Sequence, residues 1–190
     1  VIIFTDDMGY ADPACFGGTY APTPNIDRLA REGIKLTDFH VAQPVCSASR
    51  AALLTGCYPK RVSLHQNEKW RGVLFPGNQR GLNPSEITIA EVLKARGYAT
   101  GIVGKWHLGD QPEFLPTNQG FDHYFGIPYS NDMQRNSLED GRRVTPLLRD
   151  DKVAELLEDD GQRRVTREYT EEAVNFIEAT SDKPFFLYLP

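Results

Sequence analysis

Short apolar segments predict buried strands at three places in the chain. Val1–Thr5, Ala99–Val103 and Pro184–Pro190 each contain branched or aromatic residues in a run too short for a helix. Ile34–Val41 has the alternating pattern of a strand with two different faces, so it is predicted as a further strand. Short strands of continuous apolar character are typical of a parallel sheet that is covered on both faces.

Four other segments carry the end signals or the apolar periodicity of helices. The expected helices are Asn25–Glu32, Ser47–Gly56, Thr88–Arg96 and Arg164–Thr180. Glycines end the first three, and the fourth repeats apolar residues every three or four positions. Residues 57–85 and 110–150 are rich in proline, glycine and polar residues, so long surface loops are expected there. The alternation of helices with short buried strands predicts an α/β fold with a mostly parallel sheet.

The composition narrows the classes of function. The chain has 190 residues, 40% of them hydrophobic and 25% charged, which fits one globular domain and excludes a disordered chain. A formal net charge of −5 offers no basic surface for nucleic acid or for an anionic membrane. No apolar run approaches the roughly 18 residues of a membrane span. Both ends fall within strand-like segments, so we expect the chain to be part of a longer protein.

Two adjacent carboxylates, Asp6 and Asp7, follow the first predicted strand. Ligands gather at the carboxyl ends of the strands in open α/β sheets. Adjacent carboxylates repel each other, and a cation that prefers oxygen ligands, Ca²⁺ or Mg²⁺, would relieve that repulsion. The alternative is a loop with two solvated acids or a helix cap.

A cysteine stands where the second helix is predicted to begin. Cys46 precedes Ser47, and the exposed N–H groups at a helix N-terminus favour an anion. Arg50 follows four residues later and therefore lies on the same face, one turn away. A potential nucleophile and a permanent cation would thus meet at one spot. The alternative is a small buried thiol beside a surface arginine.

The segment after Ala99–Val103 offers a third group of reactive side chains. Residues two apart in an extended segment share a face, so Lys105 and His107 would point into one site while Trp106 packs behind them. Lysine supplies a point charge for an anion, and histidine carries a proton near neutral pH. The alternative is a solvated strand end.

Four segments together resemble the signatures of the type I, formylglycine-dependent sulfatases, in particular the arylsulfatase-like members. Cys46–Gly56 reads CSASRAALLTG, which is similar to the family's Cys-x-Pro/Ala-x-Arg core followed by Leu-Thr-Gly. Gly97–Gly109 reads GYATGIVGKWHLG and resembles the second signature of the family. Thr5–Tyr10 (TDDMGY) and Thr23–Ala30 (TPNIDRLA) also match, in the expected order. The resemblance covers nearly the whole chain.

The resemblance implies a fold and a domain organisation. The fold would be alkaline-phosphatase-like, with a mixed, mostly parallel sheet flanked by helices on both faces, and we expect Val1–Thr5 and Ala99–Val103 to be neighbouring central strands. Residues 1–190 would form the N-terminal part of a sulfatase catalytic domain, without its remainder and without a C-terminal subdomain. The family takes a further His, an Asp/Asn pair and a Lys from later in the chain, so half of an active site is expected here.

The resemblance also implies the reactive groups. Cys46 would be oxidised after translation to formylglycine, whose hydrated aldehyde is the nucleophile. Asp6, Asp7 and the residue at position 46 would hold a divalent cation, usually Ca²⁺, with Mg²⁺ as the alternative. A thiol or a serine lacks the second hydroxyl through which the hydrated aldehyde can release sulfate. The third motif position is Ala48, where Pro is commonest, and this departure bears on how the cysteine is matured.

Four more residues match family positions. Arg50 would steady the formylglycine, Lys105 would bind sulfate, and His107 would bond the hydrated aldehyde and help to release the product. Gly126–Asp132 reads GIPYSND and resembles a loop whose serine touches substrate, so Ser130 is a candidate substrate contact.

These roles predict a sulfuric ester hydrolase that cleaves an aryl or carbohydrate sulfate monoester. The alternatives are a phosphonate monoester or phosphodiester hydrolase of the same superfamily, and an inactive fragment that lacks the later site residues. The expected partners are a small-molecule or saccharide sulfate ester and a formylglycine-generating maturation enzyme, without nucleic acid. The resemblance places such a protein in the periplasm, outside the cell or in the lumen of an organelle.

The remaining candidates are expected to be structural. Three histidines match no catalytic role: His40, His65 and His123. Cys15 and Cys57 are either buried thiols or a disulfide pair, which their spacing does not decide. Glu171 and Glu172 are predicted to lie on a solvated helix face. Gln66–Gly72 is predicted as a surface loop, with the lining of a substrate cleft as the alternative.

Overall fold

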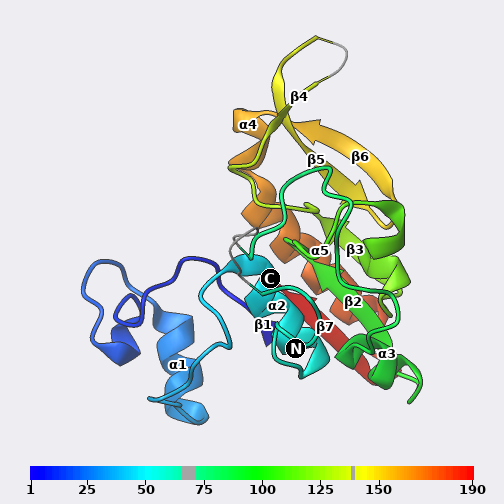
Figure 1. Cartoon of the computed structure of the whole chain (residues 1–190). Helices are drawn as coiled ribbons and strands as arrows, with labels where there is room; N and C mark the ends of the chain where they lie inside the picture. Colours follow the sequence, from blue (N-terminus) through cyan, green and yellow to red (C-terminus); the bar gives the residue numbers. More distant parts are fainter. Residues whose placement is uncertain (66–71, 138–139) are drawn as a thin grey trace. The chain divides into compact units, whose positions relative to one another are not determined.

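The computed structural model describes residues 1–65, 72–137 and 140–190, and it divides into two compact units. Val1–Phe4 and Ala42–Pro190 form the larger unit, and Thr5–Val41 forms the smaller one. Every strand of the described residues lies in the larger unit (Figure 1). No helix among the described residues combines the length and the apolar character that a membrane span requires.

The larger unit is built on a seven-stranded mixed sheet. Its strands are β1 (Ile2–Ile3), β2 (Ala99–Val103), β3 (His123–Gly126), β4 (Arg135–Asn136), β5 (Arg143–Arg149), β6 (Lys152–Leu157) and β7 (Phe185–Leu189). The order is β1-β7-β2-β3-β5-β4, and β6 also pairs with β5. Strands β1, β7, β2 and β3 run parallel, whereas β5 is antiparallel to its neighbours β3, β4 and β6. Four of the seven strands are therefore parallel, as predicted.

The predicted adjacency of the first two apolar strands is wrong, because β7 lies between them. Ile2 pairs with Tyr188 of β7, and Ile102 of β2 pairs with the same Tyr188 from the other side. Parallel strands are joined by long crossover connections, so order along the chain does not give order in the sheet.

Helices cover both faces of this sheet, as predicted (Figure 1). The helices of the larger unit are α2 (Cys46–Thr55), α3 (Ile89–Lys94), α4 (Asp159–Gln162) and α5 (Val165–Ala179), with short 3₁₀ turns at Pro112–Phe114 and Pro116–Asn118. The smaller unit has its own helix, α1 (Pro24–Glu32), and a 3₁₀ turn at Ala14–Phe16. Leu54 of α2 packs in one buried cluster with Ile102 and Tyr188 of the sheet, whereas Phe176 of α5 packs in another with Val103. Successive strand residues point to opposite faces, so neighbours such as Ile102 and Val103 enter different cores.

The four predicted helices are all present within a few residues of their expected ends. Helix α2 stops at Gly56, whose left-handed backbone (φ 66°) lets its N–H bond Ala52 O. Helix α3 begins with a capping box in which Thr88 and Glu91 each bond the other's backbone N–H. The end of α2 and the start of α3 could be predicted from the sequence because both signals lie within one helical turn.

The smaller unit corrects one predicted strand. Ile34–Val41 is irregular, and all of its residues are exposed. The fully described unit contains α1 and a 3₁₀ turn but no strand that could pair with this segment. Alternation alone does not make a strand, because the backbone groups of a strand need a partner. The segment before α1 is instead held by Asp27, whose carboxylate accepts hydrogen bonds from Cys15 N (2.8 Å) and Thr23 Oγ1 (3.1 Å).

The long loop predicted at 110–150 is also partly wrong. This stretch contains β3, β4 and β5, whereas the described residues of 57–85 contain neither helix nor strand, as expected. Pro146 sits inside β5, opposite Leu156 of β6. A proline removes a donor from the ladder and weakens the sequence signal of a strand, which explains the missed element.

Candidate active site

The first turn of α2 carries the predicted nucleophile. Cys46 is the first residue of the helix and is half-buried, and the preceding Val45 is extended (φ −135°, ψ 147°). The next four residues, Ser47 to Arg50, are buried. The thiol therefore stands where the backbone N–H groups and the helix dipole favour negative charge, as predicted.

Lys105 brings the end of β2 to the same place. Its ammonium nitrogen lies 3.2 Å from Cys46 Sγ, and the residue is 8% exposed. The two residues are 59 positions apart in the chain, so only the fold joins them. This contact makes the helix N-terminus and the strand end one electropositive site. The alternative of a solvated strand end is wrong.

Arg50 follows Cys46 by one helical turn and links α2 to the end of β2. It is 1% exposed, and its Nη1 donates a hydrogen bond to Lys105 O at 2.9 Å. Nη1 also lies 3.5 Å from Tyr188 Oη, and the guanidinium carbon is 5.4 Å from the centre of the Phe4 ring. The alternative of a surface arginine is therefore wrong, since a buried guanidinium is kept only where its donors and its flat face are accommodated.

His107 is held from two sides. The residue is 1% exposed, and its ring Nε2 lies 2.8 Å from Leu74 O. Its backbone has φ 59°, which is uncommon for a residue other than glycine, and its N–H bonds Pro128 O at 3.1 Å. Trp106 packs behind the site as predicted, fully buried, with Nε1 donating to Phe114 O at 2.8 Å.

Two glycines let the strand ends approach each other around Lys105. A Cβ on Gly126 would lie 1.8 Å from Gly104 O, and a Cβ on Gly104 would lie 2.0 Å from Pro190 O. Gly104 also has a backbone (φ 127°) that other residues rarely adopt. The ends of β2, β3 and β7 are thus packed at backbone contact, and this packing fixes where Lys105 leaves the sheet.

The predicted carboxylate ligands belong to the other unit. Asp6 and Asp7 are exposed in the unit Thr5–Val41, so their convergence with Cys46 stays a prediction. No group of three or more His, Cys, Asp or Glu among the described residues is arranged to hold a metal. The chemistry of the pair fits Ca²⁺ or Mg²⁺, because carboxylate oxygens are the ligands both ions prefer. Two carboxylates are fewer than the six to eight oxygens that Ca²⁺ takes, so the set needs ligands from elsewhere.

Ser130 lies in the loop that runs beside His107. Trp106 N and His107 N bond the carbonyls of Ile127 and Pro128, at 3.0 and 3.1 Å. Ser130 follows two residues later and is half-buried. Its contact with substrate stays a prediction.

Three contributors to the site were missed from the sequence. Ser47 Oγ accepts a hydrogen bond from Leu74 N at 3.0 Å, and Tyr188 reaches Arg50 from β7. Ser47 is the second residue of the cysteine motif Cys46–Gly56 and could have been suspected for that reason. Leu74 acts through its backbone, so its side-chain identity carried no signal.

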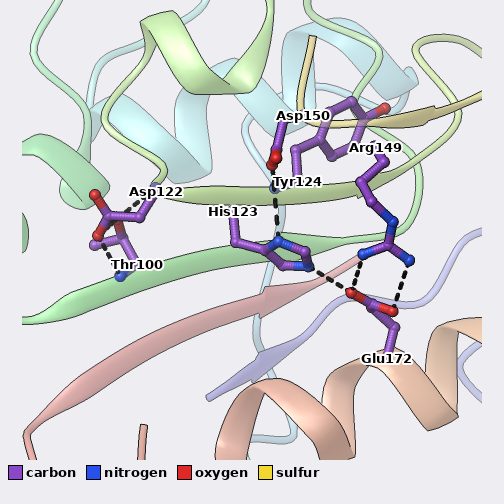
Figure 2. Close-up of polar contacts among 7 residues, drawn as sticks. All are labelled: Thr100, Asp122, His123, Tyr124, Arg149, Asp150 and Glu172. Carbon is purple, nitrogen blue, oxygen red and sulfur yellow. Dashed lines mark hydrogen bonds and ion pairs between the residues drawn. The ribbon is translucent and has the colours of Figure 1, made fainter. Parts of the chain in front are cut away.

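On the opposite face of the sheet, His123 has a structural role, as predicted (Figure 2). Its Nε2 lies 2.8 Å from Glu172 Oε1, and its Nδ1 lies 3.7 Å from Asp150 Oδ1. Arg149 binds Glu172 through two contacts, at 2.5 and 3.0 Å. The hydrogen bond from Arg149, followed by the nearby His123, holds the pKa of the Glu172 carboxyl below its ordinary value.

The predicted solvation of the two α5 glutamates is therefore half right. The Glu171 side chain is 65% exposed and pairs with Arg167, whereas the Glu172 side chain is only 17% exposed. Glutamates one residue apart point in different directions from a helix, and only Glu172 faces β3 and β5.

The remaining histidines and cysteines lie at exposed or half-buried positions. His40 is exposed beside Asp38 (2.7 Å), and His65 is half-buried. Cys15 and Cys57 are half-buried free thiols in different units, so whether they pair stays open. Of the predicted loop Gln66–Gly72, residues 66–71 lie outside the described part of the chain.

Comparison with known proteins identifies the family. The family model described as Sulfatase matches residues 1–190, and the chain therefore belongs to the sulfatase family. Arylsulfatase A of Homo sapiens is 52% identical over 134 residues, which cover 70% of this chain and 25% of that protein. N-acetylgalactosamine-6-sulfatase of Mus musculus is 39% identical over 205 residues, which cover 99% of this chain and 38% of that protein.

A solved structure agrees with the fold. A sulfatase from Pseudoalteromonas sp. superimposes with a TM-score of 0.79 at 30% sequence identity, over 98% of this chain and 42% of that one. The expected alkaline-phosphatase-like α/β fold is thereby confirmed. The chain spans between 25% and 38% of the length of the two curated relatives.

Proposed function

We propose that the full-length protein is a sulfuric ester hydrolase that cleaves sulfate monoesters, with residues 1–190 as the N-terminal part of its catalytic domain. The observation that carries this proposal is the 3.2 Å contact between Lys105 Nζ and Cys46 Sγ, in a chain of the sulfatase family. A cation beside a helix N-terminus is suited to bind a tetrahedral oxyanion such as sulfate. An anion bound there would lie against the side chain at position 46.

Two groups that the chain would acquire complete the chemistry. Formylglycine made from Cys46 supplies, when hydrated, one hydroxyl that attacks sulfur and a second through which sulfate is released. Asp6 and Asp7 would hold a divalent cation, Ca²⁺ or Mg²⁺, which supplies positive charge to that nucleophile. A maturation enzyme is the partner that would perform the oxidation of Cys46.

The residues of this chain then have separate tasks. Lys105 binds a sulfate oxygen and stabilises charge that develops on it in the transition state. Arg50 keeps the first turn of α2 and the Lys105 backbone in register through its bond to Lys105 O. His107 accepts and returns a proton, a task that its burial beside the β2 end suits. Ser130 contacts the substrate.

The proposed substrate is an aryl or carbohydrate sulfate. The support is that the relatives include an arylsulfatase and an N-acetylgalactosamine-6-sulfatase by name. A second reaction, hydrolysis of a phosphonate monoester or a phosphodiester, is favoured by the same electropositive site, because a phosphoryl group is also a tetrahedral oxyanion. The proposed location is the periplasm, the cell exterior or an organelle lumen, and finding the mature protein only in a cytosolic fraction would contradict it.

The test uses the full-length protein, produced with and without a formylglycine-generating enzyme. Mass spectrometry of the peptide that contains position 46 first measures the fraction of thiol that has become aldehyde. Turnover of a nitrophenyl sulfate is then compared with turnover of the matching nitrophenyl phosphodiester. We expect sulfate hydrolysis in proportion to the converted fraction and its loss on chelation of divalent cations. Turnover without conversion, faster cleavage of the phosphodiester, or conversion without any turnover would overturn the proposal.

A further inference from the structure

Ser47 makes an unusual contact for a residue in the first turn of a helix. It is fully buried, and its hydroxyl oxygen accepts a hydrogen bond from the backbone N–H of Leu74 at 3.0 Å. Leu74 lies in a stretch without helix or strand, so no regular ladder positions its backbone. The bond to Ser47, together with the burial of the Leu74 side chain (2% exposed), holds it in place.

The other polar group of Leu74 faces His107. The Leu74 carbonyl oxygen lies 2.8 Å from His107 Nε2, and both residues are buried. A carbonyl oxygen can only accept a hydrogen bond, so Nε2 must carry the hydrogen. This holds for the neutral ring and for the charged ring alike. Nδ1 is therefore the ring atom at which His107 gains or loses a proton.

We propose that Ser47 is a positioning residue that, through the backbone of Leu74, fixes the His107 ring with a permanent hydrogen on Nε2 and assigns proton transfer to Nδ1. The proposal rests on the proposed function, because it deepens the role of His107 in it. It connects the residue next to the nucleophile with the residue that moves the proton, by way of Leu74 alone. A shift of Leu74 would rotate the ring or mix its two tautomers, and either change would misdirect the proton.

The backbone of His107 strengthens the dependence of its ring on the position of Leu74. Its left-handed conformation (φ 59°) and its N–H bond to Pro128 fix the Cα, and the contact at Nε2 then orients the ring. Outer hydrogen-bond partners of functional histidines commonly set the tautomer in this way, and their loss costs about 10- to 100-fold in activity.

The test has a spectroscopic arm that needs no turnover. Nitrogen-15 spectra of histidine-labelled full-length protein with an unconverted Cys46 thiol report which ring nitrogen is protonated, and His107→Gln assigns the signal. We expect the Nε2–H form of neutral His107 in the wild type. In Ser47→Ala we expect mixed tautomers and faster hydrogen exchange of the Leu74 amide.

The matched control is Thr55→Val, which removes another α2 hydroxyl that accepts a backbone N–H, that of Cys57 at 3.2 Å, away from Leu74. Ser47→Thr keeps the hydroxyl and should behave as the wild type. In the matured enzyme, with rates normalised to the converted fraction, Ser47→Ala should lower kcat by about 10- to 100-fold with KM changed less than about twofold. Thr55→Val should leave both constants unchanged.

The outcomes separate the two proposals. An Nδ1–H tautomer in the wild type, or a Ser47→Ala protein with unchanged tautomer and unchanged kcat, would overturn the role of Ser47. If Ser47→Ala does not fold, an Nδ1–H tautomer in the wild type would still overturn it. A wild type with the expected spectrum that hydrolyses no sulfate ester would instead overturn the proposed function and leave the positioning contact intact.

Discussion

Each face of the sheet carries one histidine and one arginine that lies over an aromatic ring, but the partners differ. Near α2, Arg50 Nη1 donates to Lys105 O and His107 Nε2 lies against Leu74 O, so backbone carbonyl groups help to orient both side chains. Near α5, Arg149 and His123 both contact the Glu172 carboxylate. A neutral acceptor orients a side chain without cancelling its charge, whereas a carboxylate does both. Near α2, carbonyl groups thus orient side chains beside the contact between Lys105 and Cys46, whereas near α5 the Glu172 carboxylate clamps a helix to the sheet.

The largest expected effect separates the two histidines. His107→Ala in the matured enzyme should lower kcat by about 10²–10⁴-fold, because it removes the proton carrier. His123→Ala should leave kcat unchanged and lower stability instead. Steady-state kinetics and urea unfolding of both full-length variants check this. Equal kcat values for the two variants would remove the functional difference between the faces.

The lysine at the nucleophile comes next. Lys105→Ala should lower kcat/KM by about 10²–10³-fold, because the charge on the sulfate oxygens loses its partner in the transition state. Lys94→Ala is the control, since Lys94, the last residue of α3, forms an exposed ion pair with Asp122 (2.7 Å). A Lys105→Ala enzyme with the kcat/KM of the wild type would contradict the assignment of the anion site.

The two arginines are expected to differ in their effect on the conversion of Cys46 to formylglycine. Arg50→Ala should leave the Cys46 thiol unconverted, because Arg50 lies in the motif that the maturation enzyme would read and supports the first turn of α2. Arg149→Ala should leave conversion complete. Mass spectrometry of the peptide containing position 46 measures both. Full conversion in Arg50→Ala would show that maturation does not require this side chain.

The smallest effect is a pH dependence of stability at the α5 clamp. The pKa of Glu172 is lowered in the folded state, chiefly by Arg149, so its contribution is complete above the ordinary value of 4.5 and is lost as the pH falls through the folded value. Glu172→Gln should therefore lower the free energy of unfolding by about 1 kcal/mol at pH 7, and by less near pH 3. Urea titrations at the two pH values test this, with Glu171→Gln as the exposed control. A difference that grows as the pH falls would reverse the assigned sign.

The sequence predicted what depends on local signals. Cys46 at a helix start and Lys105 after a strand were recognisable because the helix stop at Gly56 lies ten residues after Cys46 and the apolar run Ala99–Val103 ends two residues before Lys105. The contact between these two residues depends on β2 and α2 packing together, which the motifs implied only through resemblance.

The parts that sequence reasoning missed are non-local. The insertion of β7 between β1 and β2 depends on pairings between segments more than 80 positions apart, as in Thr100 with Phe186. The role of Leu74 rests on backbone atoms that every residue type shares. The exposed segment Ile34–Val41 failed as a strand because it has no pairing partner in its unit. Each miss reflects a contact that no single segment encodes.

The close packing at Gly104 and Gly126 has a consequence for protein engineering. No side chain fits at Gly126 beside Gly104 O or at Gly104 beside Pro190 O. In most variants of a library that randomises these two positions, the backbone would have to shift and would move Lys105 away from Cys46. A library aimed at new substrates should therefore keep Gly104 and Gly126 and vary Tyr129–Met133, the segment that follows Gly126 in the chain. A selection run on such a library would test the loop without disturbing the chemistry beneath it.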